Sequence, residues 1–232
     1  HSMLILFDID GTLLLGTPEA HTVALARAAA EVFAVPATAD DVVAISPGGR
    51  TDQEIARLIL RRHGVDDEAI SAGLADWKHR AAHLYPDLAT RHAPQATAPG
   101  AAEALARTAG LGASLSLLTG NLEPIAHAKL DAGGLGAWFP PGVGAFGSDH
   151  EVRDALVPIA VGRSGGRGPA VVVGDTPRDV ACARAGGARC IGVTTGIHHA
   201  ATLHGADAVV PSLLDAVEVL EGWMNDGVGL AS

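Results

Sequence analysis

Residues 3–12 read MLILFDIDGT, an apolar run from Met3 to Phe7 that turns acidic at Asp8 and Asp10. An apolar run of this length is typical of a β-strand that is buried on both faces of a parallel sheet. Two carboxylates at the carboxyl end of such a strand repel one another and need a proton or a cation beside them. Ligands of open α/β sheets bind at that end of the strands. The stretch therefore predicts a ligand site, with a strand followed by a merely acidic turn as the alternative interpretation.

Two later apolar runs also end in polar residues. SLSLLTGN (114–121) places Thr119 after its apolar part, and AVVVGDTPRD (170–179) places Asp175 after its own, with Asp179 one helical turn further on. Because the carboxyl ends of parallel strands meet at one edge of a sheet, we expect these polar residues and the Asp8–Asp10 pair to form a single site.

With the motifs DIDGT (8–12), LLTGN (117–121) and GDTPRD (174–179) in this order, the chain resembles the haloacid dehalogenase superfamily of phosphohydrolases. The nearest likeness is the phosphoglycolate-phosphatase-like branch, which carries a helical C1 cap between the first two motifs. The resemblance spans nearly the whole chain. It implies an α/β fold in which a doubly wound, Rossmann-like parallel sheet forms the core and an all-helical cap is inserted into it.

The hydrophobic periodicity agrees with that organisation. Residues 16–97 show helical patterns and no strand pattern, and they are predicted to form the cap. Residues 3–15 and 98–232 are predicted to form the catalytic core. After residue 98 strands alternate with helices, as in βαβ units with right-handed crossovers. The expected strands include 113–118, 142–146 and 170–173, and a helix is expected over 149–162.

Composition narrows the range of partners. The 232 residues are 48% hydrophobic and carry a formal net charge of −10 with no basic run, which argues against nucleic-acid binding. No apolar segment is long enough to span a membrane, and the first apolar run leaves no room for a signal peptide. The only two cysteines, Cys182 and Cys190, are predicted to be buried thiols in a reducing compartment. We therefore expect a cytoplasmic enzyme, monomeric or homodimeric, that acts on a small phosphorylated metabolite.

The resemblance assigns roles to the acidic residues. Asp8 would be the nucleophile that forms an aspartyl-phosphate, and Asp10 the general acid that protonates the leaving alkoxide and later activates water. Mg²⁺ would be bound by the side chains of Asp8 and Asp175 and by the carbonyl of Asp10. Asp179 would reach the metal through water or orient Asp175, and its alternative role is to interact with a helix dipole.

Phosphate-binding residues follow from the second motif. The resemblance implies that the Thr119 hydroxyl binds a phosphate oxygen, and that Gly120 and Asn121 offer backbone N–H groups at a helix N-terminus, a natural anion site. A lone threonine at the end of a strand carries little information, so this assignment depends on the complete set of motifs.

The cation that neutralises the phosphoryl oxygens is the point where the chain departs from the family pattern. The usual Lys-Pro dipeptide is absent from FGSDHEVRDALVPIA (146–160), so we favour Arg153, which can bind phosphate oxygens in a bidentate manner. Lys129 is the competitor, interpreted as a solvated residue in the middle of a helix. Accordingly, Arg153→Ala is expected to cripple turnover and Lys129→Ala to be nearly neutral.

In the predicted cap, the loop SPGGR (46–50) ends in Arg50, which could contact the substrate; an exposed arginine without a role is the alternative. The predicted function is Mg²⁺-dependent hydrolysis of a phosphate monoester. Alternatives are a β-phosphoglucomutase-like phosphotransferase or isomerase, and a binding module that has lost turnover. A phosphonatase is discounted because its cap uses a lysine where this loop has Arg50. The cap is expected to move on two short crossings and to select the substrate.

Overall fold

A five-stranded parallel sheet organises the computed structural model, which describes residues 2–166 and 168–226. The strand order is β4-β1-β5-β6-β7, and every pairing is parallel. The strands are β1 (Leu4–Phe7), β4 (Ser114–Leu117), β5 (Ala170–Gly174), β6 (Arg189–Val193) and β7 (Ala208–Val210). β1 lies between β4 and β5, so the three motif strands are immediate neighbours, and the predicted α/β fold is confirmed.

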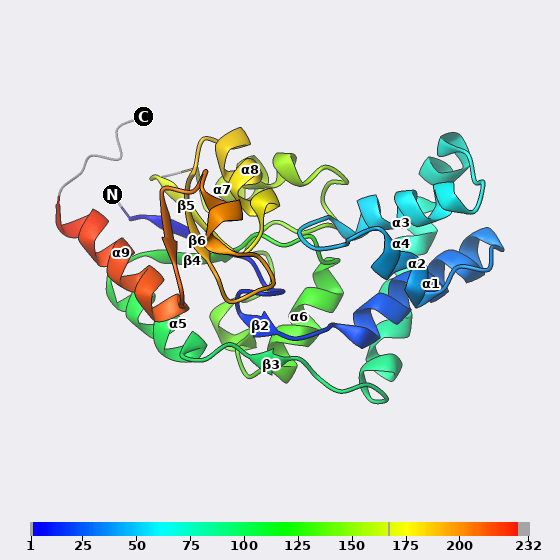
Figure 1. Cartoon of the computed structure of the whole chain (residues 1–232), viewed down its shortest axis with the longest axis horizontal. Helices are drawn as coiled ribbons and strands as arrows, with labels where there is room; N and C mark the ends of the chain where they lie inside the picture. The colour runs from blue at the N-terminus through cyan, green and yellow to red at the C-terminus, as the bar shows by residue number, and fades with distance from the viewer. Residues whose placement is uncertain (1, 167, 227–232) are drawn as a thin grey trace.

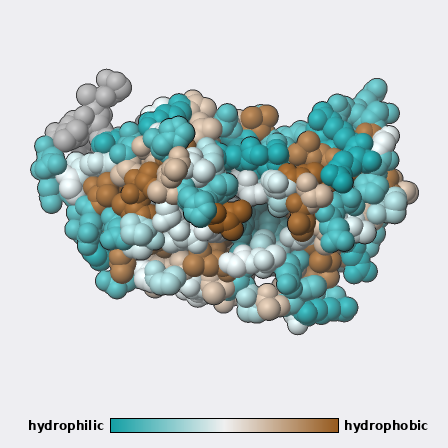
Figure 2. All heavy atoms as spheres, in the orientation of Figure 1, coloured by the Kyte–Doolittle hydropathy of each residue, from teal (hydrophilic) through white to brown (hydrophobic). Residues whose placement is uncertain are grey.

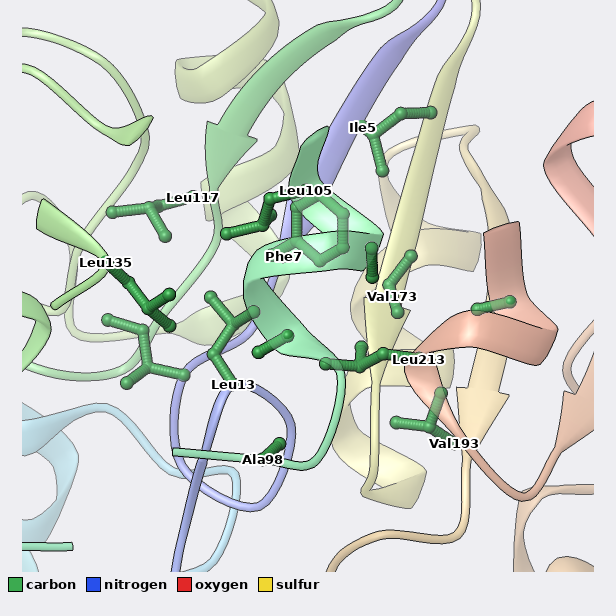
Figure 3. Packing of buried hydrophobic residues seen from close by; sticks show 14 of the residues in the cluster. Ile5, Phe7, Leu13, Ala98, Leu105, Leu117, Leu135, Val173, Val193 and Leu213 are labelled. Carbon is green, nitrogen blue, oxygen red and sulfur yellow. The ribbon is translucent and has the colours of Figure 1, made fainter. Parts of the chain in front are cut away.

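Both faces of the sheet are covered by helices, which explains why β1 is apolar at every position. On one face Ile5 and Phe7 pack with α5 (Ala101–Gly110) and α9 (Leu213–Asn225), and Figure 3 shows Phe7 among side chains of the neighbouring strands and α5. On the other face Leu4 and Leu6 pack against α7 (Leu156–Arg163) and α8 (Pro177–Ala185). Figure 1 shows the two pairs of helices on opposite sides of the sheet.

Four helices separate the first motif from the rest of the sheet and lie to one side of it in Figure 1. They are α1 (Glu19–Phe33), α2 (Ala39–Ala44), α3 (Asp52–Arg62) and α4 (Asp67–Ala89). Their core contains the fully buried Trp77, whose indole N–H donates to the Leu25 carbonyl at 3.1 Å. Leu122 and Ile125, at the start of α6 (Glu123–Ala132), belong to the same apolar cluster, so α6 joins the two units. We use the predicted names cap (16–97) and core for them.

The chain passes between core and cap twice, and the two passages pair. β2 (Leu14–Leu15) and β3 (Ala96–Thr97) form an antiparallel two-stranded sheet. The expectation that the segment 16–97 contains no strand is therefore wrong at its last two residues. The reason is that β3 is only two residues long, too short to produce an alternating pattern.

Two other expectations differ from the structure. The predicted strand 142–146 is wrong, because this segment makes only an isolated bridge between Leu118 and Ala145. Gly142 and Gly144 have φ values of 86° and 107°, which no regular strand contains. The predicted helix 149–162 starts late: η2 (Arg153–Ala155) precedes α7, since residues 146–149 form a turn closed by the Asp149 carboxylate.

The remaining elements are two short 3₁₀ helices, η1 (Gly136–Trp138) and η3 (Ala200–Leu203). Within the described residues, no helix combines the length and the apolar character needed to cross a bilayer. Cys182 and Cys190 are both free and buried, which confirms the predicted pair of thiols.

Candidate active site

Three of the predicted site residues come together at the carboxyl ends of β1 and β5. Carboxylate oxygens of Asp8, Asp175 and Asp179 all lie within 4.8 Å of one another, and all three residues are buried. The turn after β1 makes this possible: Gly11 has φ 82°, and a Cβ there would lie 2.1 Å from an Asp175 oxygen. Only glycine combines that backbone conformation with such a close approach.

The charge of this acidic cluster is only partly balanced. The Arg153 guanidinium lies 3.3 Å from Asp8 Oδ1 and also binds the Asp179 carboxylate. Burial, with Asp179 as the next cause, raises the pKa of Asp8 well above its usual range, although Arg153 opposes the shift. Burial and Asp179 likewise raise the pKa of Asp175 to about 7. Three buried carboxylates and one guanidinium leave excess negative charge among oxygen ligands, so the donor set fits a hard divalent cation such as Mg²⁺.

The raised pKa of Asp175 predicts how pH affects stability. In the metal-free native state Asp175 keeps a proton that the unfolded chain loses near pH 4, so the free energy of unfolding should fall as pH rises from about 4 to about 7. Mg²⁺ binds the ionised carboxylate, and its stabilising effect should grow over the same range. Thermal denaturation should therefore show a larger increase in Tm on adding Mg²⁺ at pH 8 than at pH 5. Asp175→Asn should reduce both trends; equal Mg²⁺ effects at the two pH values would contradict the assignment.

Asp179 has two functions in this geometry. One oxygen, Oδ1, binds Arg153, while Oδ2 accepts hydrogen bonds from the backbone N–H of Thr176 at 3.0 Å and from its hydroxyl at 2.8 Å. Together with the reciprocal hydrogen bond, which the Asp179 backbone N–H donates to Thr176 Oγ1, these contacts form a capping box at the start of α8. Asp179 thus lies in the acidic cluster and also caps a helix, and its role toward the metal stays a prediction.

Asp10 contacts a different set of partners. Its Oδ1 lies 2.6 Å from Lys129 Nζ and accepts from Gln95 Nε2 at 2.9 Å, and its Oδ2 accepts from Asn121 Nδ2 at 2.8 Å. Burial alone would raise the pKa of Asp10, but Lys129 and the other donors outweigh it and hold the pKa below its usual range. Lys129 is only 4% exposed, so its interpretation as a solvated helix residue is wrong.

The second motif is arranged around the buried Thr119. Its Oγ1 accepts hydrogen bonds from the Asn121 side chain at 2.7 Å and from the Asn121 backbone N–H at 3.1 Å. The Asn121 N–H, which was expected to be offered to phosphate, is therefore directed at Thr119. Gly120 packs against the cap, since a Cβ there would lie 2.1 Å from the Arg50 carbonyl oxygen. Asn121 gains a role that the sequence did not suggest, because its amide links Asp10, Thr119 and Lys129.

Two site residues were missed at the sequence level, His21 on α1 and Asp52 at the start of α3. Lys129 Nζ lies 3.3 Å from His21 Nδ1, and His21 Nε2 lies 2.8 Å from Asp52 Oδ2. Asp52 Oδ2 also accepts the backbone N–H of Leu122 at 2.7 Å. An ammonium only donates, so His21 Nδ1 accepts and Nε2–H donates to Asp52. The three Lys129 protons are then directed at Asp10, Asn121 and His21.

The cap loop 46–50 is docked on the core. The Gly49 carbonyl accepts from Arg153 Nη1 at 3.1 Å, and the Gly48 carbonyl accepts from Arg178 Nε at 3.1 Å. Gly49 has φ 76°, and a Cβ there would lie 2.7 Å from Thr176 Oγ1. The loop therefore connects the cap directly to the residues around the acidic cluster.

A cavity of about 430 Å³ lies between core and cap and includes Asp8, Asp10, Asp175 and Arg153 in its wall. Arg50 also lines it, but its guanidinium is turned back: Nη1 lies 2.5 Å from Glu54 Oε1, and Nε donates at 3.3 Å to carbonyls of its own loop. Because the Glu54 carboxylate binds Arg50, only half of a capping box forms at Thr51, whose side chain accepts the Glu54 backbone N–H.

Comparisons with known proteins agree with this geometry. A family model described as haloacid dehalogenase-like hydrolase matches residues 5–184. The chain is 28% identical over 209 residues to a Dickeya dadantii protein named "Probable phosphatase IndB", covering 89% of this chain and 87% of that protein. It is also 28% identical over 235 residues to the phosphoglycolate phosphatase of Pseudomonas putida, covering 98% and 82%. The structure of CbbY from Rhodobacter sphaeroides in complex with phosphate matches at TM-score 0.64 and 22% identity, covering 90% of this chain and 94% of that one.

Proposed function

The chain belongs to the haloacid dehalogenase-like hydrolase family, and on this basis we propose that it is a Mg²⁺-dependent phosphatase acting on a small phosphate monoester. The observation that carries the proposal is the buried Asp8 carboxylate, which lies beside Arg153 and two further carboxylates at one end of a cavity. A carboxylate nucleophile, a cation for the phosphoryl group and oxygen ligands for a metal are thereby combined. The relatives named as phosphatases support the same reaction class.

In the proposed mechanism an Asp8 oxygen attacks phosphorus, and the bond from phosphorus to the ester oxygen breaks. Asp10 gives a proton to the departing alkoxide. It then takes a proton from a water molecule whose oxygen attacks the aspartyl-phosphate, which releases phosphate and restores Asp8. Mg²⁺, held by Asp8, Asp175 and the Asp10 carbonyl with Asp179 behind them, would supply positive charge against the phosphoryl oxygens.

Arg153 and the Thr119 hydroxyl are proposed to bind the phosphoryl oxygens, with Gly120 and Asn121 forming the adjacent loop. Arg153 is well placed because it contacts Asp8 directly, and its buried Nε has no hydrogen-bond partner among the described residues. Such an orphaned buried donor favours an anionic ligand.

Lys129 sets the protonation state of Asp10 in this arrangement. Their 2.6 Å contact favours the ionised carboxylate, the form that accepts a proton from the attacking water. To protonate the leaving group, Asp10 must first take up a proton, so the contact with Lys129 has to lengthen during the first step. His21 and Asp52 fix the ammonium from the cap side and act as positioning residues.

The proposal is tested by measuring inorganic phosphate released from a panel of phosphate monoesters. We expect release with Mg²⁺, loss of release in excess chelator, and recovery when Mg²⁺ is restored. Full activity in chelator would contradict the metal assignment. A product in which phosphate has moved within the substrate would favour the phosphoglucomutase-like alternative, and no turnover of any ester would favour a binding module.

Arg153 and Lys129 should be distinguishable by their effects on phosphate binding. Arg153→Met should raise the inhibition constant of inorganic phosphate by about tenfold or more, because a charge-assisted contact is lost. Lys129→Met should leave that constant within about threefold but lower kcat by about 10²-fold, because Asp10 loses its ammonium partner. Lys129→Ala is accordingly no longer expected to be neutral. The opposite pattern would assign the phosphate-binding role to Lys129. Thermal denaturation controls for folding, since both cations are buried and each contacts a carboxylate.

Location, partners and cap motion complete the proposal. Free, buried Cys182 and Cys190 support a cytoplasmic protein. The cavity between core and cap supports a small phosphorylated metabolite as substrate. Substrate entry then requires the cap to move away from its contacts at Gly48 and Gly49.

A further inference from the structure

The wall of the cavity changes character between core and cap. Carboxylates from β1 and β5 line its core end, whereas the cap contributes apolar side chains and glycines together with the polar residues Thr17, His21, Thr22, Arg50 and Asp52. Seven apolar residues line the cavity, of which Leu25, Val42 and Ile55 are at most 4% exposed: Leu15, Pro18, Leu25, Val42, Pro47, Ile55 and Ile197. Figure 2 shows hydrophobic residues, in brown, on both sides of the recess between the two units. The greater part of the exposed surface of the whole wall is apolar, so the part of the substrate that projects from the phosphate meets a largely apolar surface.

The cationic side chains in this wall are already bound to acids. Arg153 contacts Asp8 and Asp179, and Arg50 is paired with Glu54. His21 is occupied by Asp52 and Lys129, which leaves His198, at the end of the loop that carries Ile197, as the other basic residue of the wall. In the described part of the chain no guanidinium or ammonium of the wall lacks an acidic partner, and the unpaired Nε of Arg153 is the donor proposed for the phosphoryl group. A carboxylate on the leaving group would therefore be placed near several acids without a matching cation.

Ile197 supports the same conclusion independently. It is 86% exposed, yet its loop is held in place: the Thr195 hydroxyl donates to the Gly11 carbonyl at 2.6 Å. A Cβ on Gly196 would lie 1.9 Å from an Asp175 oxygen, so the loop approaches the acidic cluster closely. Single exposed apolar residues are common on proteins, but this one lines the cavity that contains the nucleophile. A substrate with an apolar body would cover it.

We propose that the leaving group is an uncharged alcohol with an apolar body, larger than the two-carbon acid of phosphoglycolate. This inference rests on the proposed phosphatase function. The cavity of about 430 Å³ has more room than a phosphate and a glycolate fill, and apolar surface removed from water supplies binding energy roughly in proportion to its area. Arg50 then stabilises the cap loop through Glu54 and does not select a carboxylate.

Three esters with similarly poor leaving groups test the preference: benzyl phosphate, propyl phosphate and phosphoglycolate, each assayed with Mg²⁺. We expect kcat/KM for benzyl phosphate to exceed that for propyl phosphate by about tenfold or more, because the ring fills the apolar part of the cavity. Phosphoglycolate should be the poorest substrate. A kcat/KM for phosphoglycolate equal to or above that for benzyl phosphate would overturn the proposal.

Binding measured without turnover separates this proposal from the proposed function. 2-Phenylethylphosphonate and 3-phosphonopropionate replace the ester oxygen of benzyl phosphate and phosphoglycolate by CH₂ and cannot be hydrolysed. Calorimetry in the presence of Mg²⁺ should show tighter binding of the phenyl compound by about tenfold. If the phenyl compound binds more tightly but no ester is hydrolysed, the proposed phosphatase function is contradicted and the apolar site is supported. Tighter binding of the carboxylate would overturn the apolar site even if the protein is a phosphatase.

Variants locate the effect. Ile197→Ser should raise KM for benzyl phosphate by about three- to tenfold and KM for propyl phosphate by a smaller factor, because the ring has more apolar area with which to cover Ile197. Val43→Ser is the matched control, since Val43 is 63% exposed and does not line the cavity. Arg50→Ala should change kcat/KM for benzyl phosphate and kcat/KM for phosphoglycolate by the same factor. A selective loss of kcat/KM for phosphoglycolate would give Arg50 a carboxylate-binding role and overturn the proposal.

Discussion

Replacement of Asp8 by Asn is expected to abolish turnover, with kcat reduced by about 10⁴-fold or more, because an amide cannot form the acyl phosphate. The fold should be retained. Asp8 is 4% exposed and lies close to Asp179 and Asp175, so burial and like charges disfavour its ionised form. Removing that charge at constant shape relieves repulsion in the metal-free protein. The Tm of the metal-free variant at pH 8 should therefore equal or exceed that of the parent.

This combination of results separates a chemical role from a structural one. Loss of activity with an unchanged or raised Tm, and with binding of a phosphonate retained, is the outcome that a nucleophile produces. Near wild-type kcat for Asp8→Asn would exclude the covalent route. A collapse of Tm together with activity would mean that Asp8 serves mainly to hold Arg153 in place.

The second large effect is expected for Asp10→Asn, which keeps the size of the side chain but cannot exchange a proton. With alkyl phosphates kcat should fall by about 10²- to 10⁴-fold, because the alkoxide leaves unprotonated. p-Nitrophenyl phosphate has a leaving group that needs no proton, so transfer of its phosphoryl group to Asp8 should remain fast. Hydrolysis of the phosphoenzyme still lacks its base. Rapid mixing should then show a burst of nitrophenolate matching the enzyme concentration, followed by slow turnover.

Asp8→Asn provides the control for that experiment, since it should give no burst with the same substrate. Equal losses on alkyl and nitrophenyl esters, with no burst, would mean that Asp10 acts by orienting its neighbours and not by proton transfer. Lys129 and Asn121 would then be the neighbours to examine, because both contact the Asp10 carboxylate.

The sequence predicted the sheet and the acidic cluster because both depend on local signals. Each motif strand is an uninterrupted apolar run, and the strand ends of a parallel sheet meet at one edge, so Asp8 and Asp175 are brought together by topology alone. Arg153 could be located from its place in the segment 146–160, and the structure puts its guanidinium 3.3 Å from Asp8. Its role as the phosphate-binding cation stays a prediction.

The site residues that the sequence analysis missed are brought together by long-range contacts, which leave no local pattern in the sequence. His21 and Asp52 are 31 positions apart and meet only because α1 and α3 pack together in the cap. Asp52, next to the N-cap Thr51, resembles an ordinary acid near a helix N-terminus. Lys129 was a different kind of error, because a local signal existed: it follows the buried Ile125 by four residues and so shares its helix face. The charge of Lys129 favours a solvated position, whereas the periodicity of its helix indicates a buried one.

The pairing of β2 with β3 has a consequence for how such a chain can change over generations. The inserted segment leaves the sheet at Leu15 and returns at Ala96, two residues that are direct partners in an antiparallel ladder. The segment therefore begins and ends at one place, and its eighty residues connect the two strands as a hairpin turn would. Residues can be inserted at such a point without displacing the strands of the sheet. The catalytic half can then remain fixed while the inserted half is lengthened, shortened or exchanged, and new specificities can arise without rebuilding the site that breaks the bond.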